Sequence, residues 1–394
     1  MISRKSKGIS DATLFYIHSG IFAFSEIIFL ISLPILFWQQ GFSLSFIFAF
    51  YAFAALPGYF FTLPLIQYGL KIHLKKILIF GIFFYIALAI ISPLIQINNG
   101  WWIIAFLLLS LQALCYFPAR YIYFSEIASK KTIGFQTGIV NAVMMVARTL
   151  APIIAGFIAF FTQFNWVFLF GALFMLLSII PIFFIRIKIR HSCQTEVFHA
   201  MRKEHPVFKN TQATYIAAGM SGTLSYLLWP LLFFLLLNQS GYFGLTSLMT
   251  VTYGISAIIM LIVGHFFDRQ HRKMLLKGSV MFNILATLGR FALLFFHPLL
   301  FVYGIQSLYS FTESALQSTF EGYLFSYSKI TNTVFFTIHR EMNNALGRFF
   351  AGAILALASF VFTDIKILWF FFLVNIPVVL IYLRKGKIDY YLKK

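Results

Sequence analysis

Twelve long apolar segments dominate this chain and limit what it can fold into. They lie near residues 14–38, 43–66, 77–97, 101–125, 134–161, 166–186, 213–237, 243–267, 274–297, 298–325, 333–361 and 366–384. An α-helix needs about 20 apolar residues to cross a bilayer core. Hydrophobic residues make up 60% of the 394 and charged residues only 10%, against about 25% charged in ordinary soluble domains. The sequence therefore predicts an all-α polytopic membrane protein with twelve transmembrane helices and excludes a soluble enzyme.

The positions of the basic residues predict the topology. Of the 30 Lys and Arg, 24 lie on the two tails and on the connections that follow even-numbered segments, five lie within segments, and one, Lys366, lies on the opposite side. Basic residues stay on the cytoplasmic side. Both termini are therefore expected in the cytoplasm, and the net charge of +19 indicates topology rather than nucleic-acid binding. The first apolar run lacks a cleavage site and is expected to be a retained first span.

The second half of the chain resembles the first. Lys75-Lys76 and Gly81 match Arg272-Lys273 and Gly278 at an offset of 197 residues, and Ala155-Gly156 match Ala351-Gly352 at 196. Repeated halves of six spans are a layout found among transporters. We predict a six-helix bundle over residues 1–186, a hydrophilic cytoplasmic linker over 187–212 and a second six-helix bundle over 213–394.

The connection between the eighth and ninth segments carries a distinctive spacing of glycine, acid and base. Its residues are Gly264, Asp268, Arg269, Arg272 and Lys273. This spacing resembles the signature loop of the major facilitator superfamily. Ala151-Pro152, followed by Ala155-Gly156, is similar to the proline motif in the fifth span of that superfamily.

The resemblance implies two six-helix bundles around a central cavity lined by spans 1, 4, 7 and 10. It also implies alternating access by rocking of the two bundles, with the loop at Asp268 and Arg272 acting as a conformational latch. The alternative is that this loop is a basic turn that only sets topology.

The tenth segment carries a polar stripe. Its members are Gln306, Ser310, Glu313, Gln317 and Glu321, spaced by three or four residues, and they therefore share one helix face. Such a stripe cannot face lipid. Glu313, near mid-span, is a candidate for proton coupling, and Gln306 and Gln317 are candidates for the cavity lining.

The eleventh segment offers candidates for ion pairing and for substrate binding. If it forms a hairpin with the tenth, Glu321 comes within reach of Arg340, and Glu313 falls level with Asn344 and within a turn of Arg348. Buried ion pairs that involve Glu321, Arg340 and Glu341 are one interpretation. Alternatively, Asn344 and Arg348 line the cavity, where the guanidinium fork of Arg348 suits an anionic substrate group.

The first segment places Glu26 near its middle and His18 two turns earlier. Ionisable groups inside a membrane are candidate functional residues. Glu26 is therefore a second proton-coupling candidate, and His18 could relay protons to it. The alternatives are a Glu26 that pairs with an arginine and a His18 that is only hydrogen-bonded.

Other segments add candidates for the cavity lining. These are Gln112, Asn141, Arg148, Tyr226 and Trp229. Arg120 lies close to the end of its segment and is expected to extend to the interface, and Arg290 is expected to be structural.

The sequence contains no phosphate-binding loop, no nucleophile–base set and no metal-ligand spacing. We therefore expect no enzyme activity and no cofactor. The leading hypothesis is a secondary active transporter, a monomer of the bacterial inner membrane. It would move a small charged or zwitterionic organic solute, coupled to protons, with efflux favoured over uptake. The alternatives are a lipid or lysolipid flippase on the same fold and a membrane sensor that does not transport.

Overall fold

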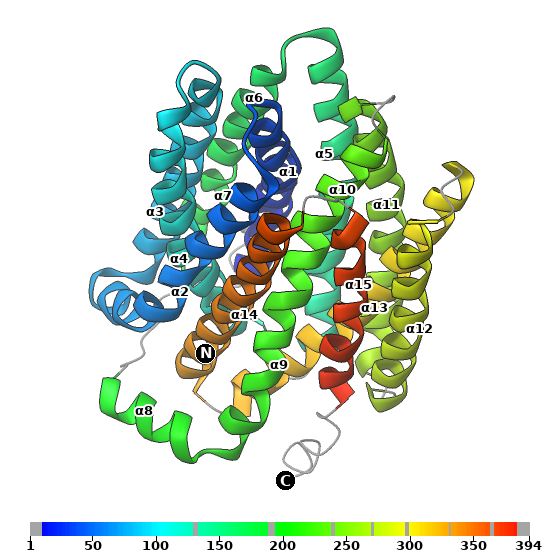
Figure 1. Ribbon diagram of the computed structural model, residues 1–394. Helices are drawn as coiled ribbons and strands as arrows, with labels where there is room; N and C mark the ends of the chain where they lie inside the picture. The colour runs from blue at the N-terminus through cyan, green and yellow to red at the C-terminus, as the bar shows by residue number, and fades with distance from the viewer. Residues whose placement is uncertain are drawn as a thin grey trace.

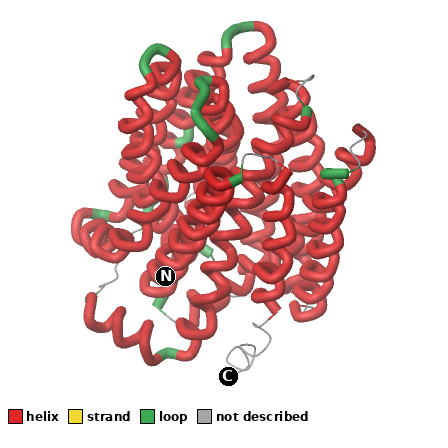
Figure 2. Tube along the Cα trace, viewed as in Figure 1, coloured by secondary structure: helices red, strands yellow, loops and turns green. Residues whose placement is uncertain are grey.

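The computed structural model describes residues 10–128, 133–187, 194–237, 241–268, 272–295, 299–330, 332–362 and 366–383. Over these residues all regular structure is helical (Figure 2). The first half contains α1 Asp11–Gln39, α2 Leu44–Ile72, α3 Leu74–Ile91, α4 Trp102–Ile127, α5 Ile133–Phe161, α6 Phe164–Leu177 and α7 Ile179–Phe184. The second contains α8 Thr195–Glu204, α9 Pro206–Thr223, α10 Trp229–Leu236, α11 Gly241–Asp268, α12 Arg272–Ala292, α13 Leu299–Ile330, α14 Thr333–Val361 and α15 Lys366–Leu380.

Each of the twelve expected segments coincides with one helix or with two consecutive helices. Among the described residues, nine helices are long and apolar enough to cross a membrane, and a shorter apolar helix covers Leu368–Leu383. The sixth span is divided into α6 and α7, and the seventh into α9 and α10 around a π-helical turn at Leu224–Leu228. These features confirm an all-α protein with the membrane-spanning architecture that the apolar pattern predicts.

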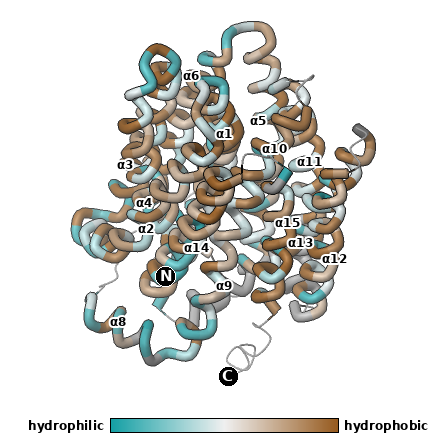
Figure 3. Tube along the Cα trace, in the orientation of Figure 1, coloured by the Kyte–Doolittle hydropathy of each residue, from teal (hydrophilic) through white to brown (hydrophobic). Residues whose placement is uncertain are grey.

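The seventh span begins earlier in the chain than predicted. Helix α9 begins at Pro206 rather than near residue 213, with the His205 side chain accepting a hydrogen bond from the Val207 N–H at 3.3 Å. Proline is well suited to the first turn of a helix, where its missing N–H costs no hydrogen bond. The proposed linker over 187–212 therefore includes the first residues of α9. Within it the amphipathic α8 lies across the lower end of the bundle, and hydrophilic and hydrophobic residues follow one another along it (Figure 3).

The two halves meet along two pairs of long helices. Helix α2 packs against α14, and α5 packs against α11. Figure 1 shows the blue and cyan helices of the first half on the left, the yellow and red helices of the second on the right, and the orange α14 next to α2. Because these pairs lie on either side of α1 and α4, side chains between them are enclosed by protein rather than lipid.

Small residues and hydroxyls bring the halves together at the end of the bundle where α1 finishes. The Ser32 hydroxyl lies 2.8 Å from the Tyr242 hydroxyl, and the Ser45 hydroxyl donates to the Ala356 carbonyl at 2.9 Å. Gly156 packs against Thr246 with no room for a Cβ. The halves are therefore in close contact at this end, which leaves the interior space nearer the end where α1 begins.

Helices α9 and α14 cross at a pair of glycines. A Cβ on Gly219 would overlap the Asn344 carbonyl, and one on Gly347 would overlap the Ile216 carbonyl. Small residues at a crossing let two backbones approach closely in a membrane. This crossing sets the position of α14, and with it the positions of Asn344 and Arg348.

Replacing Gly219 with Ala should destabilise the protein, because the added methyl group cannot be accommodated between two backbones. Overpacking of this kind costs about 1–3 kcal/mol of unfolding free energy, measurable by denaturation in detergent. The matched control is Gly222→Ala, one turn along the same helix, where an added Cβ meets nothing within 4 Å. Equal stability of the two variants would contradict the proposed crossing.

Candidate functional site

A cavity of about 300 Å³ lies between the two halves. Its lining comes from α1, α2, α3, α4 and α5 of the first half and from α9, the π-helical turn, α13, α14 and the turn after α15 of the second. The charged and amide side chains along it are Glu26, Gln112, Arg120, Asn141, Arg148, Glu313, Gln317, Glu321, Arg340, Asn344 and Arg348. Most of the residues that the sequence marked as cavity candidates are therefore brought to one space, together with Tyr226.

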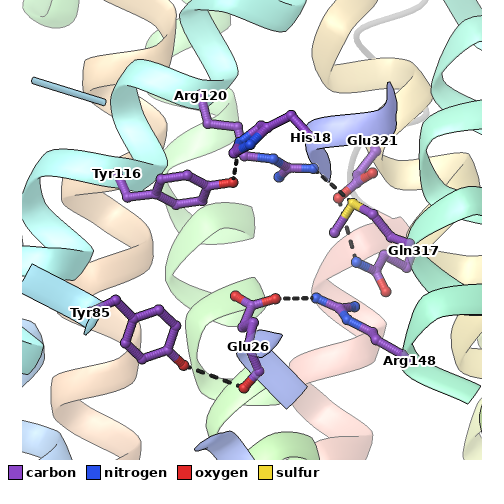
Figure 4. A network of polar contacts seen from close by, with 9 residues as sticks. His18, Glu26, Tyr85, Tyr116, Arg120, Arg148, Gln317 and Glu321 are labelled. Carbon is purple, nitrogen blue, oxygen red and sulfur yellow. Dashed lines mark hydrogen bonds and ion pairs between the residues drawn. The ribbon is translucent and has the colours of Figure 1, made fainter. Parts of the chain in front are cut away.

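Glu26 and Arg148 form an ion pair at the cavity wall. Arg148 Nη2 lies 2.7 Å from Glu26 Oε2, and both side chains are 8% exposed. Figure 4 shows the pair between α1 and α5, with the Tyr85 hydroxyl donating to the Glu26 carbonyl at 3.3 Å. The Arg148 guanidinium also faces the Tyr226 ring of the second half, 6.0 Å from its centre. This pair therefore neutralises two buried charges and touches both halves.

His18 lies inside the first half and is not part of the cavity's described lining. Its Nδ1 is 2.8 Å from the Ser178 carbonyl, and its Nε2 is 3.0 Å from the Tyr116 hydroxyl (Figure 4). The Phe22 and Tyr116 rings stack beside it, with centres 3.7 Å apart. Both ring nitrogens are engaged, so the structure favours the hydrogen-bonded interpretation over a proton relay to Glu26.

Glu313 is held by uncharged groups. Its Oε2 accepts hydrogen bonds from the Asn283 amide at 2.9 Å and from the Tyr309 hydroxyl at 3.3 Å. The Tyr309 hydroxyl also lies 2.9 Å from that of Ser225, in the π-helical turn. Glu313 does not form the ion pair with Arg348 that a hairpin of the two segments would allow, because α13 packs mainly on α11 and α12 whereas α14 packs on α2 and α9.

Glu321 also differs from the predicted hairpin. It accepts hydrogen bonds from Asn141 across the interface at 2.6 Å and from Gln317 at 3.4 Å. Arg340 instead pairs with its neighbour Glu341, at 3.6 Å, and lies over the Tyr121 ring, 3.5 Å from its centre. Tertiary packing thus gives Glu321 a partner in the first half rather than one in the adjacent helix.

Gln306 and Trp229 lie outside the cavity's described lining. Gln306 accepts two hydrogen bonds from Arg290, at 2.7 and 3.2 Å, and the Arg290 guanidinium is 3.8 Å from the centre of the Trp229 ring. The extra residue of the π-helical turn just before Trp229 rotates the remainder of the span by roughly 100° relative to an uninterrupted α-helix. Trp229 was proposed for the cavity lining only as an aromatic residue of the seventh span, and the π-helical turn carries no simple sequence signal.

Arg120 does not extend to the interface as predicted. It is 7% exposed and lines the cavity, where its Nη2 donates to the Met144 sulfur at 2.8 Å (Figure 4). Its place four residues after Tyr116 and eight after Gln112, on one helix face, was the signal available in the sequence. Arg348 also lines the cavity, with its guanidinium 5.5 Å from the centre of the Phe117 ring.

The proposed latch lies outside the described side chains. Gly264 and Asp268 fall in the last turns of α11, and Arg272 and Lys273 fall in the first turn of α12, but only their backbone is described. Arg269 lies outside the described residues. The latch therefore stays a prediction.

Replacing Glu26 with Gln should strongly destabilise the protein, because it leaves the buried Arg148 charge without a partner. Breaking a buried pair from one side costs about 3–5 kcal/mol. The double variant Glu26→Gln/Arg148→Gln should recover a large part of this loss in denaturation experiments. If the two single effects simply add in the double variant, the pair is not energetically coupled.

Comparison with known proteins agrees with this architecture. The sequence profile of the Major Facilitator Superfamily matches residues 15–352. A comparison with curated protein sequences gave no match.

Two solved structures illustrate the similarity of fold. A bacterial homologue of the iron transporter ferroportin, in an outward-facing state, superposes with a TM-score of 0.70 at 12% identity, covering 96% of this chain and 100% of the other. A variant of the E. coli fucose:proton symporter FucP superposes with a TM-score of 0.65 at 13% identity, covering 95% and 97%. The profile match spans most of the chain, and the protein therefore belongs to the major facilitator superfamily of transporters, which are not enzymes.

Proposed function

We propose that this protein is a secondary active transporter that moves a small charged or zwitterionic organic solute by alternating access. The observation that carries the proposal is the cavity between the halves, which both halves line with buried charges of both signs. Its volume of about 300 Å³ is at the lower end of the range of roughly 300–1,000 Å³ for small-molecule sites. Buried charges inside a membrane mark substrate and ion pathways.

The chemistry of the lining supports an organic solute rather than a metal ion. Arginines and carboxamides outnumber carboxylates along the cavity. Among the described residues no group of three His, Cys, Asp or Glu could hold a metal ion. A metal-ion site would need several oxygen, nitrogen or sulfur ligands converging on one point. We therefore do not propose iron, the cargo named for one structural relative, as the solute of this cavity.

We propose that solute movement is coupled to protons through Glu313, with Glu26 as the second candidate. Glu313 lines the cavity and is held by Asn283 and Tyr309, which are both uncharged. Intramembrane carboxylates are the usual proton carriers of transporters. One structural relative is named a fucose:proton symporter, which agrees with this coupling. Glu26 is a weaker candidate because Arg148 already neutralises its charge.

The proposed setting of the protein rests on its sequence. The distribution of Lys and Arg supports cytoplasmic termini, and we propose a monomer in a bacterial inner membrane. Ala151-Pro152 is similar to the proline motif that the family resemblance links to exporters, and this similarity supports efflux over uptake.

Glu313→Gln should abolish solute-driven proton movement, because the amide cannot take up or release a proton. Purified protein in liposomes with an internal pH-sensitive dye would be given amino acids, monocarboxylates, dicarboxylates and sugar phosphates in turn. The wild type should move protons with at least one class, and Glu313→Gln should still exchange that solute without moving protons.

The matched control is Glu196→Gln, on α8 outside the membrane-spanning helices, which should behave as the wild type. Proton movement that persists unchanged in Glu313→Gln would reject this residue as the carrier. No solute-linked flux of any kind would count against transport and would favour the flippase and sensor hypotheses.

A further inference from the structure

We propose that the part of the cavity along α4 is an oxyanion site, in which Arg120 of the first half and Arg348 of the second half together bind a carboxylate or phosphoryl group of a soluble solute. The inference deepens the proposed function and rests on it, because it names the charged group that the substrate carries. Arg120 was not a candidate on sequence grounds, and only the tertiary structure places both arginines in the lining of one cavity.

Two aromatic rings on α4 lie next to guanidinium groups from both halves. Phe117 and Tyr121 are four residues apart and share one face of the helix. The guanidinium of Arg348 lies 5.5 Å from the centre of the Phe117 ring. Those of Arg120 and Arg340 lie 5.4 and 3.5 Å from the centre of the Tyr121 ring. Three positive charges are therefore concentrated along about one turn of α4.

The nearby carboxylates contact groups other than Arg120 and Arg348. Glu341 pairs with Arg340. Glu321 faces the same region (Figure 4), but its two oxygens accept hydrogen bonds from Asn141 and Gln317. Within the described part of the chain, neither Arg120 nor Arg348 has a carboxylate at ion-pair distance.

The environment of Arg120 is unfavourable for a cation without a counter-charge. The side chain is buried, and its described hydrogen bond goes to the Met144 sulfur, which is a weak acceptor. Burying an unpaired charge is costly unless a partner of opposite charge is supplied. A bound anion would supply that partner.

The unsatisfied polar atoms of the cavity point to the same ligand chemistry. Among the described lining residues, the buried side-chain atoms without a hydrogen-bond partner are Arg120 Nε, Arg148 Nε, Gln112 Nε2 and Ser221 Oγ. The three nitrogens are donors, and the hydroxyl can donate. A ligand that satisfies them must be rich in acceptors, as carboxylates and phosphoryl groups are.

The origin of the two arginines suggests how binding acts on the protein. Arg120 belongs to α4 of the first half and Arg348 to α14 of the second. Like charges at an interface repel in a low-dielectric interior. An oxyanion between the two guanidiniums replaces this repulsion with two charge-assisted contacts. Occupancy of the site should therefore draw the halves together around the solute.

Binding to the purified full-length protein in detergent tests the site directly. Protection against thermal unfolding would be titrated with succinate, glucose 6-phosphate, lysophosphatidic acid and, as a cationic probe, spermidine. The wild type should be protected by succinate or glucose 6-phosphate and not by spermidine. Arg120→Gln and Arg348→Gln should each weaken that binding by about tenfold to hundredfold, as expected for the loss of a charged hydrogen bond.

Matched variants separate a binding effect from a folding effect. Arg202→Gln removes an arginine of α8 outside the cavity and should bind as the wild type does. Arg120→Lys and Arg348→Lys keep the charge but lose the guanidinium fork, so they should fall between wild type and the Gln variants. These Lys variants decide the question if a Gln variant fails to fold, as judged by size-exclusion chromatography.

Three outcomes would overturn the proposal: protection by spermidine alone, protection by lysophosphatidic acid alone, or unchanged oxyanion affinity in the Arg120 and Arg348 variants. Failure of the proposed function would look different. Oxyanion binding that depends on both arginines, without solute flux in liposomes, would leave the site standing and reject transport. Flux with unaltered affinity in both variants would support transport and reject the site.

Discussion

Charged side chains within a bilayer must be enclosed by protein, and the interior of this molecule is organised around that constraint. Most of the buried arginines and glutamates line the space where the two halves meet, whereas Arg290 is enclosed within the second half. The Glu26–Arg148 pair satisfies the constraint for charge, since the two groups lie 2.7 Å apart, while Arg148 Nε is left without a hydrogen-bond partner. Arg120, which is buried, and Arg348, which is partly buried, satisfy it only in part, because neither has a carboxylate at ion-pair distance among the described residues. The contrast between paired and unpaired charges separates the structural wall of the cavity from its proposed binding surface.

Small residues make this enclosure possible. The crossing of α9 and α14 at Gly219 and Gly347 lets two backbones touch, and it places the polar face of α14 toward α4. Close packing of α5 with α11 and of α2 with α14 joins the halves, and the contacts of Ser32, Ser45 and Gly156 close the end of the bundle where α1 finishes. A cavity that is closed at one end and lined by both halves fits alternating access, since rocking of the halves would break the contacts at one end and form them at the other. Ser32, Tyr242 and Ser45 are among the groups whose hydrogen bonds would be exchanged in that motion.

The carboxylates of the cavity differ in their surroundings, and this difference bears on coupling. Glu26 faces a cation, Glu321 faces amides from both halves, and Glu313 is held by Asn283 and by a tyrosine that also contacts the π-helical turn. A change in the charge of Glu313 would therefore alter the hydrogen bonds of the Tyr309 hydroxyl, including its contact with Ser225 in the seventh span beside the cavity. The oxyanion site along α4 and the carboxylate on α13 lie in one cavity, so an anion and a proton could be bound there together.

The sequence by itself determined the class of protein, the twelve helical segments and the set of charged residues from which a site could be built. It did so because apolar length and the cost of intramembrane charge act locally, residue by residue. Partner choice depended on tertiary structure. Glu321 bonds to Asn141 rather than Arg340 because α13 and α14 pack on different neighbours, and Trp229 faces Arg290 because a π-helical turn shifts the helix face. Arg120 lines the cavity rather than extending to the membrane–water interface, because the packing of α4 against the other helices turns its side chain inward. Helix periodicity defines the faces of each helix, but only the packing of the two halves decides what each face meets.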